Sequence, residues 1–226
     1  VLGVRLKGHG TSPWDLRSRN WQDWSASVNR GFNILRAYTR RIHIIGFSTG
    51  GLLALHHAVA YPDHSLASVI SVSAPVEFRN KNMRFVPLLH QANKLVRWVS
   101  SEGLIPFRPN PTEHPDINYM HIPIRTLYQL QKLIEDFFAR AANIDCPVTL
   151  FQSDHDPVVV PDSVNQLYRH IQARDKYINI IRSNHHGIVF DDVDDTQRKI
   201  IDTVQALSAG PVNKPGLELP APTTEA

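Results

Sequence analysis

The stretch Arg40–Pro62, RRIHIIGFSTGGLLALHHAVAYP, joins a buried-type strand to a helix through a glycine-rich turn. The apolar run Ile42–Ile45 predicts the strand, and the run rich in Leu, Ala and His predicts a helix that ends before Pro62. Between them, Gly46–Gly50 has the Gly-x-Ser-x-Gly pattern of a nucleophile elbow. Such a turn presents its serine hydroxyl at the top of the sheet, so Ser48 is the candidate nucleophile.

The residues around Ser48 have predicted roles of their own. Glycines at Gly46 and Gly50 let the strand and the helix crowd together at the turn. The backbone N–H of Thr49, at the positive end of the helix, is the predicted donor to an oxyanion on a substrate bonded to Ser48. Phe47 is a predicted substrate contact. The alternative interpretation is a serine that only caps the helix N-terminus.

A serine nucleophile needs a base, and the base needs a carboxylate that orients it. Two later loops supply such residues in the chain order serine, acid, histidine: SDHDPVV at Ser153–Val159 and SNHHG at Ser183–Gly187. Both follow predicted strands, at the sheet edge where open α/β sheets bind ligands. The sequence therefore predicts a Ser-Asp-His triad.

Each loop offers two candidates. Asp154 and Asp156 compete for the acid, and Asp156 is preferred because the Pro-Val-Val after it would anchor the loop; Asp154 would then be a solvated or loop-capping residue. His185 and His186 compete for the base, and His186 is preferred, with His185 as a structural histidine. His9, at another predicted strand end, is a predicted substrate contact or loop-packing residue near the site, and the alternative is a surface residue without a role.

Strands and helices alternate along most of the chain. This alternation predicts βαβ units and a mostly parallel sheet, which is an α/β fold. The predicted strands are 1–6, 42–45, 66–72, 147–152 and 177–181, and the predicted helices are 20–38, 48–61 and 194–207.

The alternation stops between Val76 and Asp145. Two amphipathic helices, over Phe85–Val99 and Leu127–Phe138, flank an irregular Pro-rich stretch, Ile105–Pro123. We interpret this segment as a helical lid inserted into the core. The predicted organisation is core 1–75, lid 76–145, core 146–209 and a disordered Pro-rich tail 210–226.

The composition excludes several classes of protein. The 226 residues are 42% hydrophobic and 20% charged, which is ordinary for a globular chain with a sizeable core. The net charge is +3, but Lys and Arg are scattered, so no nucleic-acid partner is predicted. The single cysteine, Cys146, excludes an intrachain disulfide. The histidines lack metal-ligand spacing, so neither a metal nor a cofactor is predicted.

No apolar run reaches the length of a transmembrane helix, and membrane association stays open. A cytoplasmic location is favoured by the single cysteine and the lack of a visible signal peptide, although the sequence starts inside a predicted strand.

These motifs together resemble the α/β-hydrolase superfamily, and within it the carboxylesterases and monoacylglycerol-lipase-like serine hydrolases. The resemblance extends to about Leu207 and implies that Asp156, in the family's D-x-V-V position, is the acid. It also implies that His186 is the base, because Asp191 follows it by the family's five residues. The matching stretches are RLKGHGTSP at 5–13, WQDW at 21–24, GFSTGG at 46–51, SDHDPVV at 153–159 and HGIVFDD at 186–192.

The sequence departs from the family at its start. In relatives, a strand and a His-Gly loop precede the GHG strand, and that loop donates the second oxyanion N–H. We therefore expect the N-terminal part of the sheet to be missing here. We also expect an upstream segment or a second chain to complete the sheet, and the 226 residues alone to be a weak esterase.

The predicted function is a serine hydrolase that cleaves carboxylic esters with an apolar acyl group through an acyl-enzyme on Ser48, without a cofactor. Two alternatives stay open. One is an acyltransferase or amidase that uses the same triad, and the other is a catalytically impaired hydrolase-like fragment.

Overall fold

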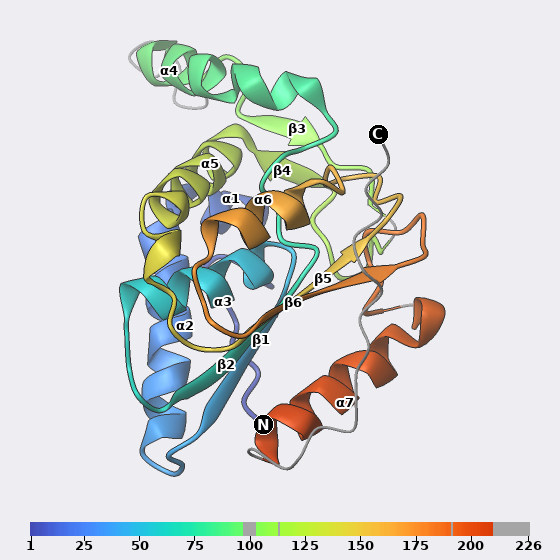
Figure 1. Ribbon diagram of the computed structural model, residues 1–226. Coiled ribbons are helices and arrows are strands. Elements are labelled where there is room, and N and C mark those ends of the chain that lie inside the picture. Colours follow the sequence, from blue (N-terminus) through green and yellow to red (C-terminus); the bar gives the residue numbers. More distant parts are fainter. Residues whose placement is uncertain (97–102, 113, 191, 210–226) are drawn as a thin grey trace.

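The computed structural model describes residues 1–96, 103–112, 114–190 and 192–209 (Figure 1). The strands are β1 (Ile42–Phe47), β2 (Leu66–Val72), β3 (Phe107–Pro109), β4 (His121–Pro123), β5 (Val148–Ser153) and β6 (Lys176–Ile181). The helices are α1 (Pro13–Ser18), α2 (Trp21–Arg36), α3 (Thr49–Ala60), α4 (Val86–Val96), α5 (Ile124–Phe138), α6 (Ser163–His170) and α7 (Thr196–Ser208).

The main sheet has the order β1-β2-β5-β6, and all of its pairings are parallel. In β5 every residue is buried, and in β2 nearly every one, as expected for central strands covered on both faces. Their carboxyl ends lie at one edge, where the loops after β1, β5 and β6 meet. The α/β fold expected from the sequence is confirmed.

Helices cover both faces of this sheet (Figure 1). Val69, Val148 and Leu150 point to the face covered by α2, α3, α5 and α6, within the larger apolar core. Ile70 and Phe151 point the other way and pack with Ile200 of α7. Successive residues of β2 and β5 therefore pack into two different apolar cores, one on each face of the sheet.

The expectation of a strand over Val1–Leu6 is wrong. These residues form no strand; the side chains of Leu2 and Val4 lie beside Gly31 of α2, and Leu6 packs on the larger core. A segment forms a strand only when its backbone hydrogen-bonds to a neighbouring strand. In the described part of the chain, β1 pairs with β2 alone. An extended segment without a neighbouring strand therefore rests on a helix instead.

The segment between β2 and β5 contains the two expected helices. α4 starts after a 3₁₀ turn at Lys81–Phe85, and the expected extension to Val99 lies outside the described residues. The stretch expected to be irregular contains an antiparallel pair, β3 with β4. Tyr119 ties this segment to the start of the chain, since its hydroxyl donates to the carbonyl of Gly8 at 3.0 Å.

Two short helices, α1 and α6, were not expected. With 6 and 8 residues they are shorter than the windows in which helical periodicity is recognised, and α1 depends on a Ser12 side chain that accepts from the N–H of Asp15. The last helix, α7, matches the expectation within two residues. The tail expected at 210–226 lies outside the described residues. Among the described helices, none combines the length and the apolar character that a membrane span requires.

The buried His57 of α3 gives the fold a predicted pH dependence. Its ring is 1% exposed and lies 4.7 Å from the ring of Phe32 and 5.3 Å from that of Tyr61. Neither ring nitrogen has a hydrogen-bond partner in the described residues. Burial, with the neighbouring His56, lowers the pKa of His57 from 6.5 to about 4. The unfolded chain therefore binds an extra proton between these values, so stability is lost as pH falls from 6.5 to 4.

We expect His57→Phe to remove the contribution of this histidine to the pH dependence of stability. The wild-type free energy of unfolding should fall by about 2 kcal/mol more than that of the variant between pH 7 and pH 4.5. Urea unfolding at both pH values measures the difference. His64→Gln, at an exposed position of the next loop, is the matched control and should keep the wild-type pH dependence. Equal pH dependence in His57→Phe and wild type would contradict the prediction.

Candidate active site

Ser48 lies between the end of β1 and the start of α3 in a backbone conformation that non-glycine residues rarely adopt, with φ 52° and ψ −123°. Its N–H donates to the carbonyl of Val72 in β2 at 2.8 Å, which fixes the turn to the sheet. Although Ser48 stands at the N-cap position of α3, its side chain makes no capping hydrogen bond. The hydroxyl is directed instead toward His186, which disfavours the interpretation as a simple helix cap.

The glycines beside Ser48 differ in what they permit. A Cβ on Gly46 would lie 2.0 Å from the carbonyl oxygen of Gly50, and one on Gly51 would lie 2.9 Å from Ser71 Oγ. A Cβ on Gly50 would meet nothing within 4 Å. The close approach expected at the elbow therefore requires glycine at position 46, whereas the expectation that position 50 also requires it is wrong. What Gly46 accommodates is the backbone of Gly50.

This difference predicts opposite outcomes for two matched substitutions. Gly46→Ala forces backbone against backbone, and we expect it to lower the free energy of unfolding by at least about 3 kcal/mol. Gly50→Ala, in the first turn of α3, should leave it unchanged or raise it by up to about 1 kcal/mol. Urea unfolding of both variants tests this. Similar destabilisation by the two would show that the elbow is not governed by the Gly46 contact.

The structure brings Ser48, His186 and Asp156 into one hydrogen-bonded chain. His186 Nε2 lies 3.0 Å from Ser48 Oγ, and His186 Nδ1 lies 2.7 Å from Asp156 Oδ2. The three residues follow β1, β6 and β5, so they come from the same edge of the sheet. This is the arrangement in which a carboxylate orients an imidazole and the imidazole faces a hydroxyl.

The carboxylate of Asp156 is fully buried and surrounded by donors. Its Oδ1 accepts from the backbone N–H groups of Val158 and Val159 at 2.8 and 2.9 Å, and its Oδ2 accepts from Gln152 Nε2 at 3.1 Å. These donors satisfy both carboxylate oxygens and hold the side chain in one orientation toward His186. The apolar restart after Asp156 does anchor the loop, through the N–H groups of those two valines.

The loop that carries Asp156 is also held from outside the core. Arg79 Nε donates to the carbonyl of Asp156 at 2.5 Å, and the Arg79 N–H donates to the carbonyl of Val158 at 3.0 Å. Phe78 forms an isolated antiparallel bridge with Val159. The first residues after β2 therefore fix the position of the acid loop.

Asp154 and His185, the competing candidates for acid and base, do not belong to the hydrogen-bonded set of Ser48, His186 and Asp156. Asp154 Oδ1 accepts from the Ser183 N–H at 2.9 Å and lies 3.0 Å from His155 Nδ1, and these contacts lower its pKa. Asp154 therefore ties the two loops together, as the loop-capping alternative expected. The N–H of His185 donates to Ser183 Oγ at 3.0 Å. Asp191, whose spacing favoured His186, lies outside the described residues.

The remaining candidates are placed around this centre. The ring of Phe47 lies 5.1 Å from that of His186 and 5.4 Å from that of Phe190. His9 is half-buried and meets Trp24 edge-on at 5.9 Å, and burial lowers its pKa. Thr49 is the first residue of α3. The roles of Phe47, His9 and Thr49 stay predictions.

Sequence reasoning missed Gln152, Arg79 and Phe190. Gln152 and Ser153 end the apolar part of β5 directly before the acid loop, and a polar residue at that place was an available signal. Arg79 lies with Lys81 and Arg84 in a short basic stretch without periodicity, and Phe190 reaches Phe47 only through the fold. No local pattern distinguishes these last two.

Comparison with known proteins agrees with this architecture. Residues 1–193 match the family model described as serine aminopeptidase, S33. A thermostable monoacylglycerol lipase of Bacillus sp. strain H-257 is 30% identical over 190 residues, which are 83% of this chain and 71% of the relative. A carboxylesterase of Bacillus subtilis strain 168 is 24% identical over 188 residues, 83% of this chain and 73% of that protein.

Solved structures share the fold at lower identity. One, described as LipS and LipT, two metagenome-derived lipolytic enzymes, superposes with a TM-score of 0.76 at 18% identity, covering 91% of this chain and 80% of the other. The monoacylglycerol lipase of Paleococcus ferrophilus gives 0.65 at 18% identity, covering 84% and 76%. With the family model spanning most of the sequence, the chain belongs to the S33 serine aminopeptidase family of α/β hydrolases.

Proposed function

We propose that this protein is a serine hydrolase of carboxylic esters that works through an acyl-enzyme on Ser48. The observation that carries the proposal is the hydrogen-bonded chain from Ser48 Oγ through His186 to the buried Asp156, at 3.0 and 2.7 Å. The named activities of the curated relatives, a monoacylglycerol lipase and a carboxylesterase, support an ester as the substrate.

The proposed reaction has two halves. In the first, His186 Nε2 accepts the proton of Ser48 while Oγ attacks the ester carbonyl, and the same proton then passes to the leaving alkoxide. This produces an alcohol and an ester of Ser48. In the second half, His186 takes a proton from water, the hydroxide attacks the acyl-enzyme, and Ser48 recovers its proton as the acid leaves. Asp156 holds Nδ1 protonated throughout and stabilises the imidazolium.

The oxyanion formed in each half needs a donor near Ser48. We assign the N–H of Thr49 to this role because it opens α3 directly after the nucleophile, where the helix leaves its first N–H groups without intrahelical partners. Removal of one such donor typically costs about 100- to 1,000-fold in turnover.

An apolar acyl group suits the surroundings of the triad. Phe47 packs against His186, Phe190 packs against Phe47 and is 49% exposed, and Val158, next to the acid loop, is 43% exposed. These side chains offer apolar surface beside the position where the acyl carbonyl would lie.

We further propose that residues 76–145 act as the lid over this site. Besides Phe78 and Arg79, which hold the acid loop, this segment reaches the site through His114, whose ring lies 5.1 Å from that of Phe190 and beside Gly187. His114 comes from the stretch between β3 and β4, so a displacement of this stretch would change access to Phe190 and Phe47.

Labelling with a fluorophosphonate tests the proposal. An activated Ser48 should react stoichiometrically, and peptide mass spectrometry should place the adduct on Ser48. Hydrolysis of p-nitrophenyl esters of increasing acyl length then reports on the apolar surface. Because the family model is described as an aminopeptidase, aminoacyl p-nitroanilides form a second panel. A folded sample that neither labels nor hydrolyses either panel would contradict the proposal.

A further inference from the structure

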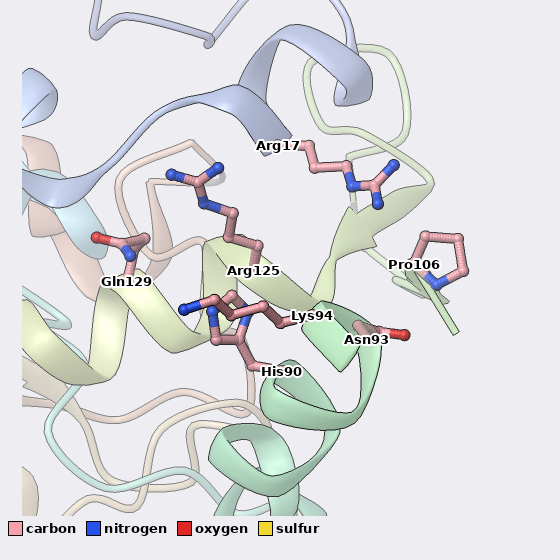
Figure 2. Close-up of a pocket in the computed structure, with 7 residues that line it drawn as sticks. All are labelled: Arg17, His90, Asn93, Lys94, Pro106, Arg125 and Gln129. Atoms are coloured by element: carbon pink, nitrogen blue, oxygen red, sulfur yellow. The ribbon is translucent and has the colours of Figure 1, made fainter. Parts of the chain in front are cut away.

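Gln152 is the one glutamine that is buried in the part of the chain that the structure describes, with 1% of its surface exposed. It lies near the end of β5, which has a neighbouring strand on each side. Gln129 of α5 differs, because it is only half-buried and lines the hollow between α1, α4 and α5 that Figure 2 shows. A fully buried amide costs free energy unless its polar atoms are hydrogen-bonded within the protein. The partners of the Gln152 amide therefore indicate what it does.

The two hydrogens of the Gln152 amide have two acceptors. Nε2 lies 3.1 Å from Asp156 Oδ2 and 3.3 Å from the carbonyl oxygen of Ser153. These acceptors determine the orientation of the amide. If it were reversed, Oε1 would face a carboxylate and a carbonyl, and neither contact could contain a hydrogen. The N–H group of Gln152 is therefore directed at the acid.

Gln152 donates to the carboxylate oxygen that also orients the base. Oδ1 of Asp156 accepts from the backbone N–H groups of Val158 and Val159 at 2.8 and 2.9 Å. Oδ2 accepts from His186 Nδ1 at 2.7 Å and from Gln152 Nε2 at 3.1 Å. A carboxylate offers about four acceptor sites, and these four donors fill them. The contact that positions the imidazole and the contact from β5 therefore meet at one atom.

We propose that Gln152 is a positioning residue of the triad, which holds Asp156 Oδ2 against His186. The inference rests on the proposed function, since it assigns Gln152 a role in the reaction at Ser48. In that reaction the imidazole becomes positively charged, and the carboxylate must keep its place beside Nδ1. Without the Gln152 donor, one acceptor site of a buried carboxylate is left unpaired and Oδ2 is held by His186 alone. The cost falls on kcat rather than on KM, because Gln152 is buried and acts through the acid.

Two substitutions separate the donor from the shape of the side chain. Gln152→Met keeps the length of an unbranched side chain but has no N–H, whereas Gln152→Glu can return a donor as its carboxylic acid. Two carboxyl groups in contact do not both ionise readily, so the introduced acid shares a proton with Asp156 until the pH is raised. The matched control is Gln166→Met, since Gln166 Nε2 also donates to a carboxylate at 3.1 Å, that of Glu77 at the surface. Circular dichroism and urea unfolding check the fold of each variant.

We expect Gln152→Met to lower kcat for a p-nitrophenyl ester with KM unchanged. The reduction should be about 10- to 100-fold, the range seen for groups that hold a metal-binding side chain from behind. Gln152→Glu should be more active than Gln152→Met at neutral pH and should lose this advantage as the shared proton leaves at higher pH. His186 and Arg79, the titratable and charged side chains hydrogen-bonded to Asp156, are unchanged in these variants. Gln166→Met should keep the wild-type kcat at every pH.

A readout that does not depend on ester hydrolysis separates this inference from the proposed function. The Nδ1 hydrogen of His186, in a 2.7 Å bond to Asp156, is expected as a low-field resonance in proton NMR. The resonance is identified by its loss in His186→Ala. Gln152→Met should shift it, and Gln166→Met should leave it in place. If this pattern is found in a protein that hydrolyses no ester, the proposed function fails while the role of Gln152 in holding the acid against the imidazole stands.

The inference is overturned if a folded Gln152→Met variant leaves the His186 resonance at its wild-type position. With an active wild type, it is also overturned if this variant keeps the wild-type kcat, or if Gln152→Glu is no more active than Gln152→Met at neutral pH. A residue that only stabilises the fold would give neither the shift nor the proton-dependent recovery of turnover.

Discussion

Ser48→Ala is expected to reduce ester turnover by about 10⁴- to 10⁶-fold. The substitution removes the hydroxyl that faces His186 and that we propose forms the acyl-enzyme, so His186 and Asp156 could then activate only water. Folding should be preserved. Alanine meets the same backbone strain as serine at φ 52°, and the hydroxyl makes no capping hydrogen bond that the helix would lose. We expect the free energy of unfolding to change by less than about 1 kcal/mol.

The chain provides a matched control for this variant. Ser73 follows β2 at the same sheet edge, has a φ of 49° and is fully buried. Its hydroxyl has no hydrogen-bond partner in the described residues. Ser73→Ala therefore repeats the chemical change and the backbone setting without touching the triad, and it should retain near wild-type turnover. Wild-type turnover by Ser48→Ala, with fluorophosphonate titration excluding contaminating enzyme, would show that Ser48 is not the nucleophile.

The elbow was predictable because its determinants are local. The strand, the glycine and the helix around Ser48 are consecutive, so one short window contains the whole arrangement. The order of the acid and histidine loops was also readable, because parallel strands bring their carboxyl ends to one edge. The different requirements at Gly46 and Gly50 could not be predicted from the sequence, because they depend on whether an added Cβ would collide with a backbone that the turn brings close.

Features that depend on distant contacts were not predictable. Val1–Leu6 has the composition of a strand, but strand formation depends on a neighbour that local composition does not supply. Phe190 reaches Phe47 from the far end of the chain.

The adjacent histidines permit a sharper test of the proposed base. We expect His186→Ala to reduce turnover by about 10⁴- to 10⁶-fold, and His185→Ala by less than about tenfold. The same atoms are removed one position apart, so composition and net charge change equally. Only His186 has its two ring nitrogens 3.0 Å from Ser48 Oγ and 2.7 Å from Asp156 Oδ2. His185 donates its backbone N–H to Ser183 Oγ, and alanine retains this contact.

Fluorophosphonate labelling separates loss of the base from loss of the fold. His186→Ala should keep the circular dichroism spectrum of wild type but label Ser48 far more slowly, because the hydroxyl no longer has an acceptor for its proton. His185→Ala should label at nearly the wild-type rate. Equal labelling rates in the two variants would remove His186 from the role of base. A slow His185→Ala beside a fast His186→Ala would transfer that role to His185 and require the loop after β6 to rearrange before catalysis.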